Sequence, residues 1–246
     1  MICTDDLFIC QERDLCMLQI LNQSLGFQQP RSLNDHTSVV AIRGDLHPKR
    51  LLLAYSMGIF PWYNEDESPI IWQSPENRMV LFPDQLYINR TLRKWMKKHP
   101  FEIKYDTNFR GVLDGCASTP RPGQDGTWLN EDLKKSFETL HEMGFAHSVE
   151  TWRDGKLVGG LYGMAMGGVF FGESMFAHED YASKTAFLTL VPQLLSYGYR
   201  MIDCQVYTRH LDSFGAIEMP RNVFLGLLHE ELKVKPSQIW PSTVRT

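Results

Sequence analysis

Length and composition describe an ordinary globular protein. The chain has 246 residues, 43% of them hydrophobic and 12% aromatic, which is enough for a full core without disulfides or a structural metal. Its 25 basic and 29 acidic residues give a net charge of −4, which excludes a disordered chain and a globally basic nucleic-acid coat protein. No run approaches the roughly 18 apolar residues of a membrane helix, and the first residues lack the basic segment of a signal peptide. We therefore expect a cytoplasmic protein without membrane contact.

The cysteines and histidines predict no metal site. The five cysteines include no C-x-x-C pair, and the eight histidines include no H-x-x-x-H or H-E-x-x-H spacing. Free thiols of this kind are typical of a reducing compartment.

The first part of the chain contains few strong structural signals. Residues 1–38 are polar and weakly patterned, so we expect an N-terminal extension of unknown role. Pro48 favours the first turn of a helix and Gly58 its end, and Pro61 favours an extended Phe60. Two short strands are expected at 70–72 and 79–82, with a turn at 74–75.

The middle of the chain predicts alternating helices and strands. Asn89, Asp106 and Asn130 are plausible N-caps, and Gly144 is a stop signal. The expected elements are a helix at 89–98, a strand at 101–105, a helix at 108–116, a loop at 118–127 and a helix at 130–144.

The last part contains the clearest pattern. Turns at 154–155 and 167–168 separate three strands, which predicts an antiparallel meander. Strands at 147–152, 157–165 and 169–176 are followed by a helix at 182–197, a strand at 199–206 and a helix at 224–232. The fold class is therefore α+β, or mixed α/β, and the order meander, helix, strand is that of GNAT-type acyltransferases.

Asp203 and Gln205 are the first candidates for chemistry. Side chains alternate along a strand, so these two share one face and Cys204 points to the other. The pair either orients an amine or a carbonyl in a reaction, or is a structural hydrogen-bonded pair. Burial would raise the pKa of the Cys204 thiol and make it a poor nucleophile.

Glu173 is the second candidate because it lies inside an apolar, strand-forming run. A carboxylate there needs a partner or a task. It could be a general base, an electrostatic stabiliser or a structural acceptor. Phe170, Met175 and Phe187 could line an apolar pocket or simply belong to the core.

A cationic stripe and several aromatic residues suggest nucleic-acid binding. Arg90, Arg93, Lys94 and Lys97 follow the i, i+3, i+4, i+7 spacing of one helix face, which suits phosphates or a solvated surface. Trp62, Trp72 and Trp128 lie in turn-rich segments, from which they could stack on bases or pack on the core.

Two nucleotide-binding motifs are missing. Residues 177–184, before the predicted helix, contain no glycine to bring backbone N–H groups onto the pyrophosphate of CoA. The sequence also contains no G-x-x-x-x-G-K-[ST] motif for ATP.

Ordered motifs over residues 40 to 230 resemble the leucyl/phenylalanyl-tRNA–protein transferase family. They include Gly44-Asp45-Leu46, Gly58-Ile59-Phe60-Pro61-Trp62, Trp72-Gln73-Ser74-Pro75, Gly126-Thr127-Trp128, His141-Glu142-Met143-Gly144, Ala146-His147-Ser148-Val149-Glu150, 157–163, Phe171-Gly172-Glu173-Ser174-Met175-Phe176, Ala182-Ser183-Lys184 and Ile202-Asp203-Cys204-Gln205. Gln73 departs from the family, which often has a second Trp there, and Glu76-Asn77 replaces an Asp-Pro pair.

The resemblance implies an aminoacyltransferase that moves Leu, Phe and less readily Met from aminoacyl-tRNA to the N-terminal Arg or Lys of proteins, marking them for degradation. It implies a small domain at 39–78 and a GNAT-like transfer domain at 79–246. Because the aminoacyl ester is already activated, no cofactor and no metal are expected, and we expect a monomer.

The resemblance also implies roles for individual residues. Asp203 and Gln205 would form a relay on the acceptor amine, assisted by Glu173. Trp62 and Trp128 would hold the terminal adenosine of the donor, and the stripe Arg90, Arg93, Lys94 and Lys97 would meet the acceptor stem of the tRNA. The pocket for the transferred side chain would consist of Leu161, Phe170, Met175 and Phe187.

Two alternatives remain at this point. One is another acyltransferase of the same fold, using CoA or a cell-wall peptide precursor, although the missing glycine-rich turn counts against CoA. The other is a non-catalytic RNA-binding module, which would leave Glu173, Asp203 and Gln205 without a role.

Overall fold

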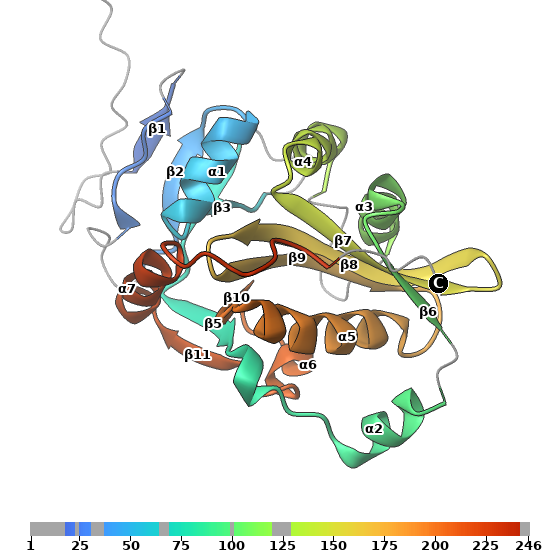
Figure 1. The fold of residues 1–246 in the computed structure, drawn as a ribbon. Coiled ribbons are helices and arrows are strands. Elements are labelled where there is room, and N and C mark those ends of the chain that lie inside the picture. Colours follow the sequence, from blue (N-terminus) through green and yellow to red (C-terminus); the bar gives the residue numbers. More distant parts are fainter. Residues whose placement is uncertain are drawn as a thin grey trace, which may run out of the picture.

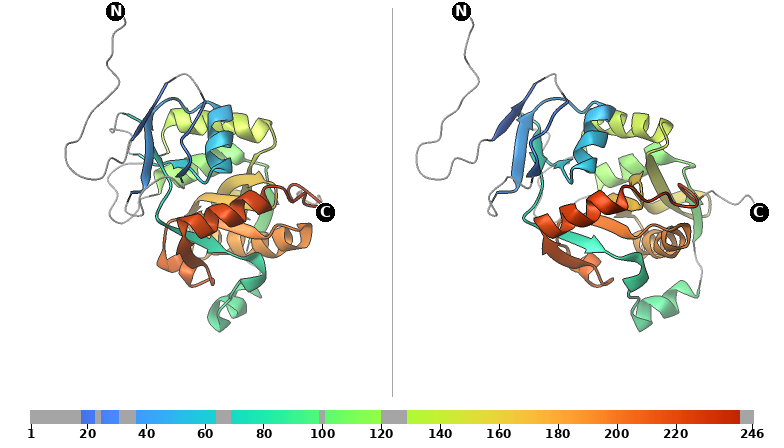
Figure 2. Two further views of the ribbon diagram at one scale, coloured as in Figure 1. Left: turned by 90° about the vertical axis from the view of Figure 1, so that its left-hand side faces the viewer. Right: turned by 60° about the vertical axis from the view of Figure 1, so that its left-hand side comes forward.

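The protein has a small sheet and a large sheet, and the small sheet lies to one side of the large one (Figures 1 and 2). The computed structural model describes residues 18–22, 25–30, 37–63, 69–98, 101–119 and 129–241. The expected α+β architecture is confirmed, with a small four-stranded sheet beside a larger seven-stranded sheet. Within the described ranges, no helix is long and apolar enough to cross a membrane.

The small domain is a four-stranded sheet with one helix. Its strands follow the order β1-β2-β4-β3. Helix α1 starts at Pro48 as expected, and Gly58 follows it at φ +72°, where a Cβ would lie 2.6 Å from Leu225. The elements are β1 (Gln19–Leu21), β2 (Val39–Arg43), α1 (Pro48–Ser56), β3 (Phe60–Pro61) and β4 (Ile71–Gln73).

Strand β1 lies within residues 1–38, which were expected from the sequence to be an N-terminal extension. It pairs in parallel with β2, so part of residues 1–38 belongs to the small sheet. The sequence did not predict β1 or β3, because strands of three and two residues are too short to show a period.

The large sheet has seven strands in the order β11-β5-β10-β9-β8-β7-β6. The predicted meander is confirmed, because β7, β8 and β9 pair antiparallel, and β10 then adds in parallel to β9 after helix α5. The strands are β5 (Asn77–Leu81), β6 (Glu102–Tyr105), β7 (Ala146–Arg153), β8 (Lys156–Met166), β9 (Val169–Ala177), β10 (Met201–Gln205) and β11 (Ile217–Pro220). The helices are η2 (Pro83–Gln85), α2 (Arg90–Met96), α3 (Phe109–Ser118), α4 (Glu131–Glu142), α5 (Ala182–Tyr197), α6 (Arg209–Asp212) and α7 (Arg221–Glu231).

Two hydrophobic cores lie on opposite faces of this sheet. Helices α3 and α4 cover one face and α5 the other (Figure 1). Along β10 the side chains alternate between them, since Met201 belongs to the first core and Ile202 and Cys204 to the second. The strand face that carries Asp203 therefore lies toward the first core, which also contains α1 and α7.

One predicted helix cap is wrong. Asn108, rather than Asp106, caps α3, and its side chain accepts a hydrogen bond from the Gly111 N–H at 3.1 Å. Asp106 instead accepts the N–H of Ser148 on the neighbouring strand β7 at 2.7 Å. The other two N-caps, Asn89 and Asn130, are confirmed. Most of the predicted loop at 118–127 lies outside the described residues.

Candidate active site

The site lies where the parallel strands β9 and β10 part. They pair only from Val169–Phe171 against Met201–Asp203, although β9 continues to Ala177. Just beyond the last pair, Glu173 is an extra residue without a partner on β8, because Gly172 pairs with Gly163 and Ser174 with Tyr162. Such a bulge re-aims a side chain and is frequent beside active sites.

A second bulge lies on β10. The register with β5 shifts between Asp203 and Gln205, and Gln205 adopts φ +64°, a conformation that is uncommon for a residue with a side chain. The two irregularities face each other across the opening, and the Gln205 Nε2 group donates a hydrogen bond to Oε1 of Glu173 at 2.8 Å. The Gln205 side chain therefore pairs with Glu173. A direct relay between Asp203 and Gln205 would have required it to pair with the Asp203 side chain instead.

Asp203 is fully buried and forms an ion pair. Its two carboxylate oxygens accept hydrogen bonds from Nε and Nη2 of Arg78 at 2.8 and 2.6 Å. Oδ1 also accepts the backbone N–H of Gln205 at 2.9 Å. Arg78 was not predicted from the sequence, although it lies in an apolar strand just as Glu173 does. A charge inside an apolar strand was the signal that could have identified it.

The environment of Glu173 favours its neutral form. Burial raises the pKa of Glu173 to about 8, and the negative charge of Asp203 acts in the same direction. The Tyr55 hydroxyl, the Arg78 guanidinium and the Gln205 amide act against this and lower the pKa of Glu173. Tyr55 comes from α1 of the small domain and is itself fully buried, and it was also missed. A carboxyl group with a pKa near neutrality suits proton transfer.

A cavity of about 390 Å³ opens beside Glu173 and Gln205. This volume is typical of a small-molecule site. The structure brings most of the predicted site residues to its wall, and Asp203 lies behind it. The wall includes Glu173, Gln205, Trp62, Leu161, Phe170, Met175 and Phe187.

The departure from the family at position 73 supports a residue of this wall without lining the cavity itself. Gln73 Nε2 donates a hydrogen bond to the backbone carbonyl of Trp62 at 3.1 Å, and so helps to fix the residue expected to stack on the donor. Trp62 packs beside Phe60 with ring centroids 6.4 Å apart. Trp128, its predicted partner, lies outside the described residues.

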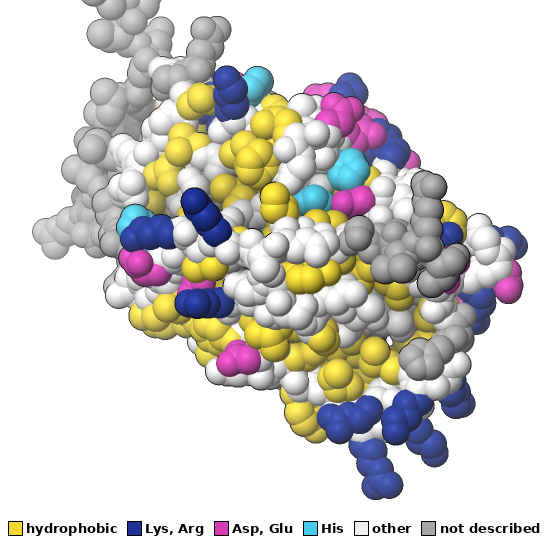
Figure 3. Space-filling model, viewed as in Figure 1, with side chains coloured by type: hydrophobic (Ala, Val, Ile, Leu, Met, Phe, Trp, Pro, Cys, Tyr) yellow, Lys and Arg dark blue, Asp and Glu magenta, His cyan; other side chains and the backbone are white. Residues whose placement is uncertain are grey.

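The cationic stripe forms as expected on α2. Arg90, Arg93, Lys94 and Lys97 are all exposed, while Leu92 between them is buried. Figure 3 shows the basic side chains gathered over α2, at the opposite end of the molecule from α1.

Cys204 is buried, as its position on the strand predicted. Burial raises the pKa of the Cys204 thiol well above its usual range, which makes the thiolate scarce at neutral pH. Cys204→Ser is therefore expected to retain most of the transfer activity, measured as turnover with saturating donor and acceptor. An inhibition of the unmodified protein by thiol reagents that a reductant reverses would contradict this.

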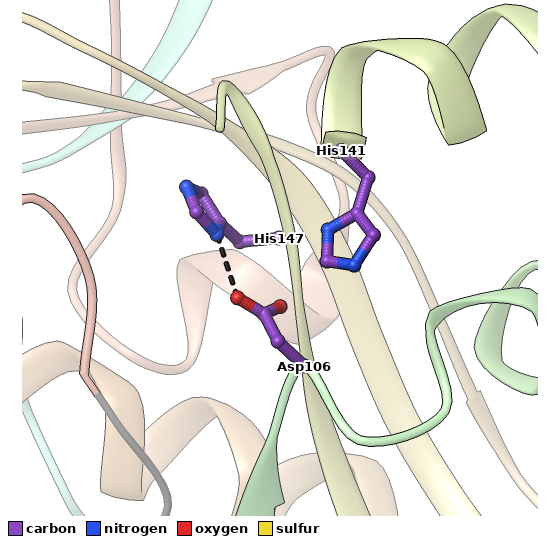
Figure 4. A group of neighbouring side chains, drawn as sticks. All are labelled: Asp106, His141 and His147. Carbon is purple, nitrogen blue, oxygen red and sulfur yellow. Dashed lines mark hydrogen bonds and ion pairs between the residues drawn. The ribbon is translucent and has the colours of Figure 1, made fainter. Parts of the chain in front are cut away.

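Asp106, His141 and His147 form a second group of polar side chains, with ligand-type atoms within 4.8 Å of one another (Figure 4). Hydrogen bonds within the protein already involve three of the four ring nitrogens of the two histidines. His147 Nδ1 pairs with Asp106 at 2.8 Å and its Nε2 with the Gly144 carbonyl at 3.2 Å, and His141 Nδ1 pairs with the Ala146 carbonyl at 2.8 Å. We interpret this group as a clamp that joins the ends of β6, α4 and β7.

Two protein-family models match this chain. The model of the leucyl/phenylalanyl-tRNA protein transferase N-terminal domain matches residues 44–76, and that of the leucyl/phenylalanyl-tRNA protein transferase matches residues 80–229. A protein named leucyl/phenylalanyl-tRNA–protein transferase from Myxococcus xanthus is 52% identical over 83% of this chain and 87% of its own length. One of the same name from Nitrosospira multiformis is 55% identical over 78% of this chain and 82% of its own.

Among solved structures, L-PGS from Bacillus licheniformis is similar, with a TM-score of 0.39 and 12% identity over 71% of this chain and 57% of that one. The two family matches together span more than half of the 246 residues, and the relatives are more than half identical over most of their length. The chain therefore belongs to the leucyl/phenylalanyl-tRNA–protein transferase family.

Proposed function

We propose that this protein transfers Leu or Phe, and less readily Met, from aminoacyl-tRNA to the N-terminal Arg or Lys of acceptor proteins, marking them for degradation. The observation that best supports this is the hydrogen-bonded pair Glu173 and Gln205 at the wall of an apolar cavity of about 390 Å³. Charged tRNA is a cytoplasmic substrate, so we place the reaction there and assign it to a monomer.

The reaction needs positioning and removal of one proton. The amine nitrogen of the acceptor forms a bond with the ester carbonyl carbon, and the bond from that carbon to the terminal ribose oxygen breaks. Glu173 in its ionised form takes a proton from the amine and returns it to the leaving oxygen. Because the ester is already activated, the free energy of the aminoacyl bond drives peptide formation without ATP.

Gln205 orients the attacking amine. Its Nε2 group is held by Glu173, so its side-chain carbonyl oxygen is the part available to accept an N–H of the amine. Asp203 contributes by holding the Gln205 backbone N–H at 2.9 Å. The three candidates thus have different roles: Glu173 moves the proton, Gln205 orients the amine, and Asp203 fixes Gln205.

The apolar wall selects the donor. Leu161, Phe170 and Phe187 are almost fully buried, and Met175 is partly buried, so the cavity presents hydrocarbon to the transferred side chain. One methylene in such a pocket contributes only about 1–3 kcal/mol to discrimination, which explains the tolerance of Met beside Leu and Phe. Trp62 and Trp128 would stack on the terminal adenosine.

The direct test is transfer of labelled Leu from charged tRNA to a peptide that begins with Arg, with the same peptide beginning with Gly as the matched control. We expect label on the Arg peptide alone, and loss of transfer when the donor is first treated with ribonuclease. Equal labelling of both peptides would contradict the acceptor specificity. Transfer that survives ribonuclease would point to a donor other than tRNA.

The stripe on α2 is expected to bind phosphates of the acceptor stem. Replacing Arg93 and Lys94 by Gln should raise KM for full-length aminoacyl-tRNA. The slope of log affinity for this donor against log salt concentration should become smaller in magnitude by roughly 0.7–0.9 per lost phosphate contact. A minimal aminoacyl-adenosine donor lacks these phosphates, so its kcat and KM should stay unchanged. Equal damage with both donors would show that α2 supports the fold instead.

A further inference from the structure

Arg78 is a buried cation at the junction of the two domains. It is 1% exposed and lies between the rings of Phe60 and Phe224, with its guanidinium carbon 4.7 and 4.6 Å from their centroids. Nη1 donates to the Gly58 carbonyl of the small domain at 3.1 Å, while Nε and Nη2 bind Asp203 of the large sheet. Every branch of the guanidinium is therefore committed to a defined partner.

A chain of hydrogen bonds connects Arg78 with the pair formed by Gln205 and Glu173. The guanidinium orients both oxygens of Asp203, Asp203 accepts the backbone N–H of Gln205 at 2.9 Å, and Gln205 Nε2 reaches Glu173 at 2.8 Å. Gln205 has a positive φ that an ordinary residue adopts only when its surroundings enforce it. The hydrogen bond from Asp203 fixes the backbone at that residue.

This arrangement also limits what Asp203 can do. Three of the roughly four acceptor sites of the Asp203 carboxylate are already used, two by the Arg78 guanidinium and one by the backbone N–H of Gln205. This carboxylate is poorly placed to accept a proton from the acceptor amine, and it does not border the cavity wall on which Glu173 and Gln205 lie.

We propose that Arg78 is a positioning residue of the transfer reaction, which holds Asp203 and, through it, the turn at Gln205 that aims the amide at Glu173. The inference rests on the proposed aminoacyl transfer. It adds a requirement for the bidentate geometry of arginine, beyond its charge, because a lysine ammonium cannot bind both oxygens of Asp203 and the Gly58 carbonyl in one plane.

The test compares Arg78→Lys with a matched control, Arg50→Lys. Arg50 is also fully buried and also binds an aspartate in two places, with both distances to Asp45 at 3.1 Å, but it lies in the small domain away from the cavity. Both variants are assayed at 10 °C, with the fold checked by circular dichroism, using aminoacyl-adenosine and an Arg peptide. Arg78→Gln is measured alongside, as a neutral side chain that keeps hydrogen-bond donors.

We expect Arg78→Lys to lower kcat at least tenfold, with KM for the minimal donor within threefold of that of the unmodified protein. Arg50→Lys should keep kcat within twofold, because Arg50 does not line the cavity and its partner Asp45 is half exposed. The pH profile gives a second readout. Glu173 is surrounded by Tyr55, Asp203, Arg78 and the Gln205 amide. The positive charge of Arg78 lowers the pKa of Glu173. Arg78→Gln should therefore move the rising limb of kcat to higher pH, and Arg78→Lys should leave it nearly in place.

Two results would overturn the inference: a kcat of Arg78→Lys within twofold of the unmodified protein, or an equal fall in kcat for Arg50→Lys. An unmodified protein that transfers nothing to the Arg peptide would instead refute the proposed function. The two failures are therefore distinguishable.

Discussion

Replacing Glu173 by Gln is expected to lower kcat by roughly 10²–10⁴-fold, the usual contribution of a positioned general base. The amide has nearly the same shape as the carboxyl group and can still pair with Gln205, so the cavity and the KM for a minimal donor should change little. It cannot take a proton from the attacking amine. Single-turnover transfer from aminoacyl-adenosine to an Arg peptide measures this step directly. A kcat within threefold of the unmodified protein would remove Glu173 from the mechanism.

The pH dependence of the same variant provides an independent check. Because burial raises the pKa of Glu173 to about 8, the ionised form is a minority at neutral pH, and kcat should rise nearly tenfold per pH unit until it levels off above that value. Residual activity of Glu173→Gln should lose the part of this limb that belongs to Glu173 and keep only the part set by the acceptor amine, whose ordinary pKa is about 7.7–8.0.

A rise in pH that raises kcat is expected to lower the stability of the folded protein. The folded state binds the Glu173 proton more tightly than the unfolded state, where the pKa is near 4.5, so stability falls as pH rises from about 4.5 through about 8. Glu173→Gln has no proton to lose at this position. Its Tm, relative to that of the unmodified protein, should therefore increase over this range.

The large domain was readable from sequence because its signals are local. The meander has glycine turns at its corners, and helix α4 is capped by Asn130, whose side chain accepts the Leu133 N–H at 2.9 Å. Each of these features is decided within a few residues. Strands β1 and β3 have only three and two residues, and β11 depends on β5, which lies more than a hundred residues earlier. No local period indicates such pairing.

Several residues that meet at the cavity were candidates from the sequence, but their contacts were predicted only in part. Alternation along a regular strand correctly separated Asp203 from Cys204. It also suggested that Asp203 and Gln205 act on each other through their side chains, which assumes a regular strand as far as residue 205. The bulges at Glu173 and Gln205 break that regularity and exchange the partners, so that Gln205 meets Glu173 and Asp203 meets Arg78. Bulges depend on register with neighbouring strands, which one sequence does not encode locally.

Asp203→Asn is expected to lower both stability and activity, because it leaves the Arg78 charge buried without a counter-ion. Breaking a buried ion pair from one side costs about 3–5 kcal/mol, which for a protein of this size corresponds to a fall in Tm of roughly 6–20 °C. Differential scanning calorimetry measures this fall. The Asn amide also places an N–H against the Nη2 donor of Arg78, so the side chain that holds the Gln205 turn is no longer clamped at both of its oxygens, and kcat should fall with it.

Gln205→Ala is the matched control on the same strand. It removes the contact with Glu173 but leaves the Arg78–Asp203 pair intact, so Tm should change far less while kcat still falls severely. The two variants together separate the structural and the chemical contribution of this strand end. A Tm of Asp203→Asn within 2 °C of the unmodified protein, on the order of 1 kcal/mol or less, would show that Arg78 finds another partner and that the pair does not hold the site.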